Sequence, residues 1–216
     1  MVRIDVISDL VCPWCYIGKR RLERALTVRP QPGLGVRWRA FQLNPGMPAG
    51  GMDRQQYMAA KFGSIERALR LYETVTRVGA SEGIDFKFDR ITRTPNTVKS
   101  HRLLYLAVQA QRQSALLDLL FAAYFTEGKD LSDGALLLTL ASRAGLDPAE
   151  AEAAIEDQSP IGAALNEDFQ ARRQGINGVP YFVFNGRFGL SGAQEPEAMF
   201  HMFDLAREDE ALQKTA

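Results

Sequence analysis

Two cysteines, Cys12 and Cys15, lie three positions apart near the start of this chain and are its only cysteines among 216 residues. Pro13 and Trp14 stand between them. Two thiols at this spacing can close into an intramolecular disulfide and open again, and the species that attacks in such an exchange is the thiolate. The pair therefore predicts thiol–disulfide chemistry.

Three other roles compete for the pair. A purely structural disulfide is disfavoured because so small a loop removes little entropy from the unfolded chain. A zinc site needs about two more ligands, and the only histidines, His101 and His201, are far apart in the sequence. Inert core cysteines are common, but the spacing Cys-Pro-x-Cys directly after a strand is more typical of redox proteins. We therefore expect redox chemistry and no metal.

The residues around the pair predict a strand followed by a helix. Residues 2–7 alternate between apolar and polar side chains, as a half-buried strand does. An apolar stripe at helical spacing comes next, formed by Ile17, Leu22, Ala25 and Leu26. Cys12 is then expected near the N-cap and Pro13 at the first helical position, where the missing N–H would lack an intrahelical partner anyway.

This placement predicts different roles for the two thiols. The unpaired backbone N–H groups and the positive end of the helix dipole favour a thiolate at Cys12, which makes it the expected nucleophile. Cys15 lies one helical turn further on and is expected to be more buried. That position suits the resolving thiol, which closes the disulfide.

The middle of the chain is predicted to form a helical bundle. A second strand is expected over 36–41, and a turn-rich segment over 43–51 ends the first part of the chain. From 52 to 174 the pattern is almost wholly helical, except for 84–91, which is expected to be extended or irregular. Helices are predicted over 66–78, over 98–111 after a cap at Asn96 or Thr97, over 114–124, from Ser132-Asp133 to Gly145, from Asp147 onward, and to 173 after a start or kink at Pro160.

Strand signals return after residue 174. A β-prone run over 179–184 is followed by Asn185-Gly186, a two-residue hairpin signal, then by a return strand over 187–191 and a helix over 195–212. Pro180 cannot donate to a sheet at the start of this run. A trans bond before it is the commoner isomer. A cis bond would instead expose the backbone of Val179 for pairing with an extended substrate.

Composition excludes several functional classes. Lysine plus arginine equals aspartate plus glutamate at 26 each, so the charge balance recruits neither nucleic acid nor an anionic membrane. No apolar run approaches the length of a membrane span, and the first strand is interrupted by acidic residues, unlike a secretory leader. We expect a cytoplasmic protein, and in a reducing cytosol a lone cysteine pair is more often catalytic than structural.

The order of these elements resembles the thioredoxin-fold DsbA family, with its inserted helical domain, over essentially the whole chain. It is most similar to the FrnE-like branch, which is related to 2-hydroxychromene-2-carboxylate isomerases and kappa-class glutathione transferases. The residues that carry the resemblance are Ser8-Asp9, Cys12-Pro13-Trp14-Cys15-Tyr16-Ile17-Gly18, Phe41-Gln42-Leu43-Asn44-Pro45, Asn96-Thr97, His101-Arg102-Leu103, Gly178-Val179-Pro180-Tyr181-Phe182 and Ser191-Gly192-Ala193-Gln194.

The resemblance implies an α/β thioredoxin-like fold with an inserted all-helical domain. The thioredoxin-like domain would comprise 1–48 and 175–216, and the helical domain 49–174. Cys12 would be the nucleophile, Cys15 the resolving thiol and Pro180 a cis-proline that faces them. The residues implied in substrate binding are Pro13, Trp14, Val179, Ala193 and Gln194, the last three by analogy with relatives that hold glutathione.

This sequence departs from some relatives in ways that bear on function. The isomerases and transferases usually carry serine in place of Cys12 and lack the second cysteine, so keeping both favours dithiol redox chemistry. Periplasmic DsbA has histidine where this chain has Trp14, so this chain lacks one stabiliser of the thiolate and is expected to be a weaker oxidant. His101 lies on an otherwise apolar helix, which is typical of a satisfied core or interface residue, and the resemblance gives it no chemical role.

We expect a thiol–disulfide oxidoreductase that acts on disulfide- or thiol-bearing proteins or small molecules. The alternative is a glutathione-dependent isomerase or transferase acting on a small aromatic substrate, and a third option is a non-enzymatic adaptor with a thioredoxin fold. No tightly bound cofactor is expected, and glutathione is the candidate co-substrate. The expected assembly is a monomer or a homodimer.

Overall fold

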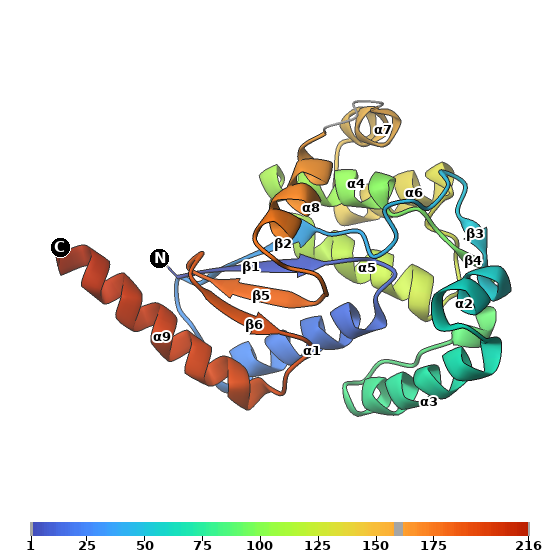
Figure 1. Ribbon diagram of the computed structural model, residues 1–216. Coiled ribbons are helices and arrows are strands. Elements are labelled where there is room, and N and C mark those ends of the chain that lie inside the picture. Colours follow the sequence, from blue (N-terminus) through green and yellow to red (C-terminus); the bar gives the residue numbers. More distant parts are fainter. Residues whose placement is uncertain (1, 158–161, 216) are drawn as a thin grey trace.

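A computed structural model describes residues 2–157 and 162–215 of the chain (Figure 1). Its main sheet has four strands in the order β2-β1-β5-β6. The strands are β1 (Arg3–Ser8), β2 (Gly35–Ala40), β5 (Tyr181–Phe184) and β6 (Phe188–Ser191). β1 pairs parallel with β2 and antiparallel with β5, which in turn pairs antiparallel with β6. The two ends of the chain therefore build one sheet.

Helices cover both faces of this sheet (Figure 1). On one face lie α1 (Pro13–Val28) and α9 (Pro196–Thr215), whose apolar side chains share a core with Ile4 and Val6 of β1. On the other face Ile7 packs with Ala171 of α8 (Ala163–Arg173). The expected half-buried strand is thus wrong in one respect, because β1 is central and is covered on both sides.

Asp5 shows how the covered strand tolerates a polar residue. Its side chain is buried, and its carboxylate is 3.0 Å from Nε of Arg3 and 3.6 Å from Nη1 of Arg39. A buried charge needs such partners. Asp5 is a polar position of the alternating pattern that suggested a solvent-exposed face. It is instead buried, and its charge is balanced by these two arginines.

The segment between β2 and β5 is mainly helical, as expected. Its helices are α2 (Arg54–Phe62), α3 (Ile65–Ser81), α4 (Val98–Gln109), α5 (Gln113–Phe125), α6 (Gly134–Ala144), α7 (Pro148–Glu156) and α8. It also holds two short strands that the sequence did not suggest, β3 (Met52–Asp53) and β4 (Arg93–Thr94), which pair antiparallel. Strands of two residues are too short to carry a periodic pattern. The irregular segment 84–91 contains a 3₁₀ turn at Phe88–Arg90.

Helix boundaries follow the capping residues closely. The Asp133 carboxylate accepts hydrogen bonds from the backbone N–H groups of Ala135 and Leu136, and α6 ends at Gly145 in the left-handed conformation. Thr97 is the N-cap of α4 without a side-chain bond, and Asn96 Oδ1 accepts from Val98 N–H at 2.9 Å instead. The expected start or kink at Pro160 lies outside the described residues.

Aromatic packing joins the helical segment to the sheet through α1. Tyr16 stacks on Phe121 of α5 with ring centroids 4.9 Å apart, and it meets Phe86 edge-on at 6.0 Å. One continuous core cluster contains residues of both parts. Thus α1 is fixed between the sheet and the helical segment. Within 2–157 and 162–215, no helix is long and apolar enough to cross a membrane.

Candidate active site

The two cysteines lie where β1 turns into α1. Cys12 is the N-cap of the helix with φ −94° and ψ 109°, and Pro13 is at its first position. The N–H of Cys12 donates to the carbonyl of Asp9 at 3.1 Å, and the N–H of Cys15 donates to the carbonyl of Cys12 at 3.0 Å. Both thiols are free. The turn therefore holds the two residues one helical turn apart, as the spacing predicts.

The two sulfurs differ in their surroundings. Cys12 is 4% exposed and Cys15 is 0% exposed. Burial raises the pKa of the Cys15 thiol well above its usual value, and hydrogen bonding and charge from Cys12 raise it further. The Asp9 carboxylate acts in the same direction, whereas a hydrogen bond from the Asp9 backbone N–H lowers this pKa. Cys15 is therefore a protonated, inward-facing thiol at neutral pH.

Cys12 faces the strand-entry proline from the far end of the chain. Its Sγ lies 3.5 Å from the carbonyl oxygen of Val179, and the Val179–Pro180 peptide bond is cis. The sulfur makes no capping hydrogen bond with the backbone N–H groups of α1. This differs from the expected contact, because the sulfur lies against a carbonyl just before β5 and not against the N–H groups at the start of α1.

A glycine allows this close approach. A Cβ atom added to Gly18 would lie 3.0 Å from Cγ of Pro180 and 3.3 Å from Cζ of Phe182. Both distances are tighter than ordinary van der Waals contact. Gly18 belongs to the motif that carried the resemblance, but the sequence did not indicate its contact with Pro180.

The predicted substrate-binding residues surround this contact to different degrees. Trp14 is 36% exposed at the start of α1, while Pro13 and Val179 are half-buried. The segment of Ala193 and Gln194 is connected to Pro180 because Gly192 N–H donates to the Pro180 carbonyl at 2.8 Å.

Two polar groups of that segment already have partners. The Ala193 carbonyl accepts from Nη1 of Arg21 at 2.6 Å, and Gln194 Nε2 donates to the Ser191 carbonyl at 2.8 Å. Trp14 and Val179 adjoin Cys12 directly, whereas Ala193 and Gln194 are connected to it only through Gly192 and Pro180.

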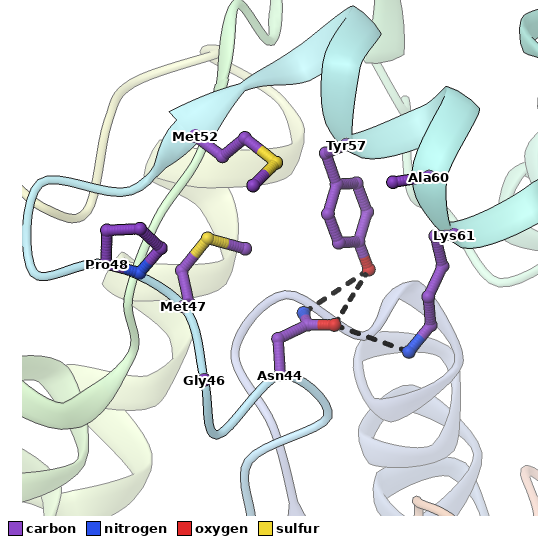
Figure 2. Close-up of a pocket in the computed structure, with 8 residues that line it drawn as sticks. All are labelled: Asn44, Gly46, Met47, Pro48, Met52, Tyr57, Ala60 and Lys61. Carbon is purple, nitrogen blue, oxygen red and sulfur yellow. Dashed lines mark hydrogen bonds between the residues drawn. The ribbon is translucent and has the colours of Figure 1, made fainter.

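A pocket of about 280 Å³ opens between the loop after β2 and α2 (Figure 2). Its lining residues are Asn44, Gly46, Met47, Pro48, Met52, Tyr57, Ala60 and Lys61. Figure 2 shows the two methionine side chains near the Tyr57 ring, and the ammonium group of Lys61 beside Asn44. Lys61 Nζ is 3.3 Å from Asn44 Oδ1, and the Tyr57 hydroxyl is 3.4 Å from the same oxygen. The pocket thus has an apolar side and a polar end.

This pocket adjoins the turn of the dithiol through Leu43, the neighbour of the lining residue Asn44, because Leu43 N–H donates to the carboxylate of Asp9 at 2.7 Å and the Asp9 carbonyl accepts from Cys12 N–H. Burial raises the pKa of the Tyr57 hydroxyl, its bond to Asn44 and the charge of Arg54 oppose the increase, and the charges of Asp9 and Cys12 add to it. The sequence did not predict Tyr57 or Lys61 as site residues, because a tyrosine and a lysine on an ordinary helix carry no motif.

Behind the turn, His101 of α4 meets two oxygen atoms. Its Nε2 lies 3.1 Å from the carbonyl oxygen of Phe41 and 3.4 Å from Oδ1 of Asp9. A carbonyl can only accept, so Nε2 carries the hydrogen. The other Asp9 oxygen accepts from Leu43 N–H at 2.7 Å. The structure therefore places His101 next to the turn that carries the cysteines.

Comparison with known proteins covers the whole chain. A family model described as DSBA-like thioredoxin domain matches residues 3–203. A solved structure described as a probable DsbA oxidoreductase from Streptomyces coelicolor is 33% identical, with a TM-score of 0.86 over 96% of this chain and 91% of that one. The uncharacterized protein YwbO of Bacillus subtilis (strain 168) is 26% identical over 217 residues, or 99% of each protein.

A more distant structure shows the same fold. It is the cytosolic disulfide reductase DsbM from Pseudomonas aeruginosa with GSH, which is 22% identical and has a TM-score of 0.61 over 99% of this chain and 100% of that one. The α/β thioredoxin-like fold with an inserted helical segment, expected from the sequence, is confirmed.

Proposed function

Because this chain belongs to the DSBA-like thioredoxin domain family, we propose that it is a thiol–disulfide oxidoreductase in which Cys12 attacks and Cys15 resolves. The observation that carries the proposal is the unequal pair at the start of α1. Sγ of Cys12 faces the Val179 carbonyl at 3.5 Å, and Cys12 keeps 4% exposure next to the exposed Trp14, while Cys15 is fully buried. A nucleophile needs access to a substrate, and a resolving thiol needs only access to its partner.

The exchange proceeds in two steps when the substrate is a disulfide. The Cys12 thiolate attacks one substrate sulfur, the substrate S–S bond breaks, and the leaving sulfur takes up a proton. Cys15 then loses its proton and attacks the Cys12 sulfur, which releases the second substrate thiol and leaves the Cys12–Cys15 disulfide. Two electrons pass from the protein to the substrate, and a substrate dithiol reverses every step.

The backbone opposite Cys12 supports a role in substrate binding. Val179 is half-buried and precedes β5, so an extended substrate segment could pair with its backbone by strand addition. Trp14 offers an exposed aromatic surface next to the reacting sulfur. These features suit a peptide or a small molecule that carries a disulfide. The cytosolic DsbM neighbour supports a cytoplasmic location, and we propose a monomer or a homodimer.

The test is reduction of a protein disulfide with a dithiol as the electron source. Wild type should catalyse it, and Cys12→Ser should reduce the rate to that of the dithiol alone. Cys15→Ser is the matched control: it should retain attack by Cys12 and accumulate a mixed disulfide that mass spectrometry detects. Equal rates for wild type and Cys12→Ser would contradict the proposal.

A second candidate is a glutathione-dependent isomerase or transferase. The observation that favours it is the pocket beside the dithiol, where apolar Met47 and Met52 lie across from the polar group of Asn44 and Lys61 (Figure 2). An ammonium group and an amide suit a carboxylate, and the apolar side suits a small aromatic molecule. The neighbouring DsbM structure with GSH supports glutathione as co-substrate.

The two candidates differ in what they require of Cys15. A dithiol oxidoreductase loses turnover in Cys15→Ser, whereas a glutathione-dependent isomerase keeps it and requires glutathione. Full activity of Cys15→Ser with an obligatory need for glutathione would favour the second candidate. Lys61→Met should then raise the KM for glutathione, because the pocket loses its cation.

A further inference from the structure

Asp9 connects both cysteines to the body of the protein. Its carbonyl accepts from Cys12 N–H at 3.1 Å, and the Cys12 carbonyl accepts from Cys15 N–H at 3.0 Å, so Asp9 is linked to both cysteines through the backbone. Its carboxylate is 1% exposed and accepts from Leu43 N–H at 2.7 Å. A shift of Asp9 therefore moves the support of both thiols at once.

The charge of Asp9 also acts on the dithiol. Its negative field opposes a second negative charge on Cys15. A buried carboxylate is costly unless hydrogen-bond donors surround it. Each donor to Asp9 also offsets part of its negative charge, so the number of donors sets how strongly Asp9 opposes a thiolate at the dithiol. Leu43 supplies one donor from the loop after β2.

His101 supplies a second donor from a different part of the chain. Its Nε2–H is shared between Phe41 O at 3.1 Å and Asp9 Oδ1 at 3.4 Å. His101 is buried and belongs to α4, in the helical segment. It is bonded to the turn and not to either sulfur, so any effect on the chemistry must pass through Asp9 and the loop at Phe41.

We propose that His101 is a positioning residue of the dithiol, which holds the Asp9 carboxylate against the Phe41 carbonyl and so sets the balance between the dithiol and disulfide states. This rests on the proposed dithiol chemistry. The helical segment then does more than cover the sheet, because one of its side chains adjusts the redox pair through a single shared hydrogen. Loss of that donor leaves the Asp9 charge less compensated, which disfavours a thiolate and shifts the pair toward the disulfide.

The experiment measures the equilibrium constant of the Cys12–Cys15 pair against reduced and oxidised glutathione. His101→Leu should shift it toward the disulfide at least tenfold, equivalent to about 30 mV. His101→Gln keeps an N–H donor and should stay within about threefold of wild type. Ser100→Ala is the matched control, a buried change on α4 at a hydroxyl without a hydrogen-bond partner among the described residues, and it should cause no shift.

A double mutant tests the route through Asp9. In an Asp9→Asn background the negative charge is gone, so adding His101→Leu should change the equilibrium less than threefold. The same tenfold shift in both backgrounds, or no shift in His101→Leu alone, overturns the inference. Should His101→Leu fail to fold, His101→Asn replaces it: its shorter amide cannot reach both oxygens, and an unchanged equilibrium there counts equally against the inference.

The outcomes separate this inference from the function on which it rests. A wild type that forms no Cys12–Cys15 disulfide in any glutathione buffer contradicts the proposed function. A wild type that forms it, with an equilibrium unaffected by His101, contradicts only the role of His101.

Discussion

At the scale of single residues, the two thiols of one short motif have different properties because their surroundings differ. Cys12 occupies the N-cap beside the Val179 carbonyl, whereas Cys15 is enclosed by the protein. The identity of the residue is the same, so it is burial and neighbouring charge that raise the pKa of Cys15.

This difference predicts the pH dependence of Cys15. Burial raises its pKa. At a given pH its thiolate fraction is therefore smaller than that of a free cysteine thiol, whose pKa is about 8.5. In Cys12→Ser, the rate of Cys15 alkylation by iodoacetamide should rise with pH to a midpoint above that value. Mass spectrometry over a pH series measures it.

The same variant unfolded in urea is the control for this measurement. Unfolding removes the burial, so the midpoint should return to that of a free thiol. Restricted access lowers the rate at every pH but does not move the midpoint. A midpoint in the folded variant at or below the free-thiol value would show that burial does not control Cys15.

At the scale of elements, α1 decides the geometry of the site. Its start carries the cysteines, Gly18 contacts Pro180 on the sheet side, and Lys19 faces the helical segment. A helix held from two sides presents its N-terminus in one orientation. Changes to its middle should therefore affect the dithiol at its start.

Gly18→Ala should weaken both stability and turnover. The new Cβ lies 3.0 Å from Pro180 Cγ, and overpacking of this kind costs about 1–3 kcal/mol. Because α1 must move away from Pro180, disulfide reduction should slow as well. Urea unfolding and the reduction assay measure the two effects.

Gly35→Ala serves as the matched glycine control. Among the residues that the structure describes, and apart from its chain neighbours, no heavy atom lies within 4 Å of its added Cβ, so both stability and turnover should stay near wild type. Equal behaviour of the two variants would mean that the contact of Gly18 with Pro180 is unimportant.

Lys19 is a buried cation whose partners are partly exposed. Its side chain is 1% exposed, and Nζ lies 2.7 Å from Asp118 Oδ1 of α5 and also contacts Glu23. Lys19→Met should change the unfolding free energy by no more than about 1 kcal/mol, because the carboxylates left behind can be hydrated.

The reverse change should be far more damaging. Removing both carboxylates (Glu23→Ala with Asp118→Ala) leaves the ammonium group buried and unpaired, at a cost of about 3 kcal/mol or more. Urea unfolding of the two variants measures the difference. If Lys19→Met is the more destabilised of the two variants, the expectation is wrong. The attraction between Lys19 and its carboxylates would then stabilise the contact between α1 and α5.

At the scale of the whole molecule, the helical segment and the sheet share one core. The main core cluster includes Val6 and Phe182 of the sheet together with Leu116 and Leu140 of the helical segment. We propose that the protein has two structural parts. The first comprises 1–48 together with 175–216, and the second comprises 49–174. A shared core predicts that neither part is stable without the other.

Two probes can follow the parts separately during unfolding. Both tryptophans, Trp14 and Trp38, lie in the first part, whereas α2 to α8 lie in the second. Fluorescence and far-UV circular dichroism should therefore give coincident urea transitions. A circular dichroism transition that clearly follows the fluorescence transition would mean that the helical part unfolds independently.

Local sequence determined the parts of this protein that depend on neighbouring residues. The dithiol at a strand–helix junction, the caps at Asp133 and Gly145 and the Asn185-Gly186 hairpin follow from spacing and backbone preference, and the structure has each of them. The resemblance to the DsbA family, carried by short motifs along the whole chain, is confirmed.

Only the tertiary structure decided which distant residues meet at the dithiol. Val179 faces Cys12, Gly18 fits against Pro180, and His101 reaches Asp9. These partners are separated by about 90 to 170 positions, and no periodicity or propensity records a contact over such a distance. The reactive pair is therefore written in the sequence, whereas its surroundings are set by how the sheet, α1 and α4 pack together.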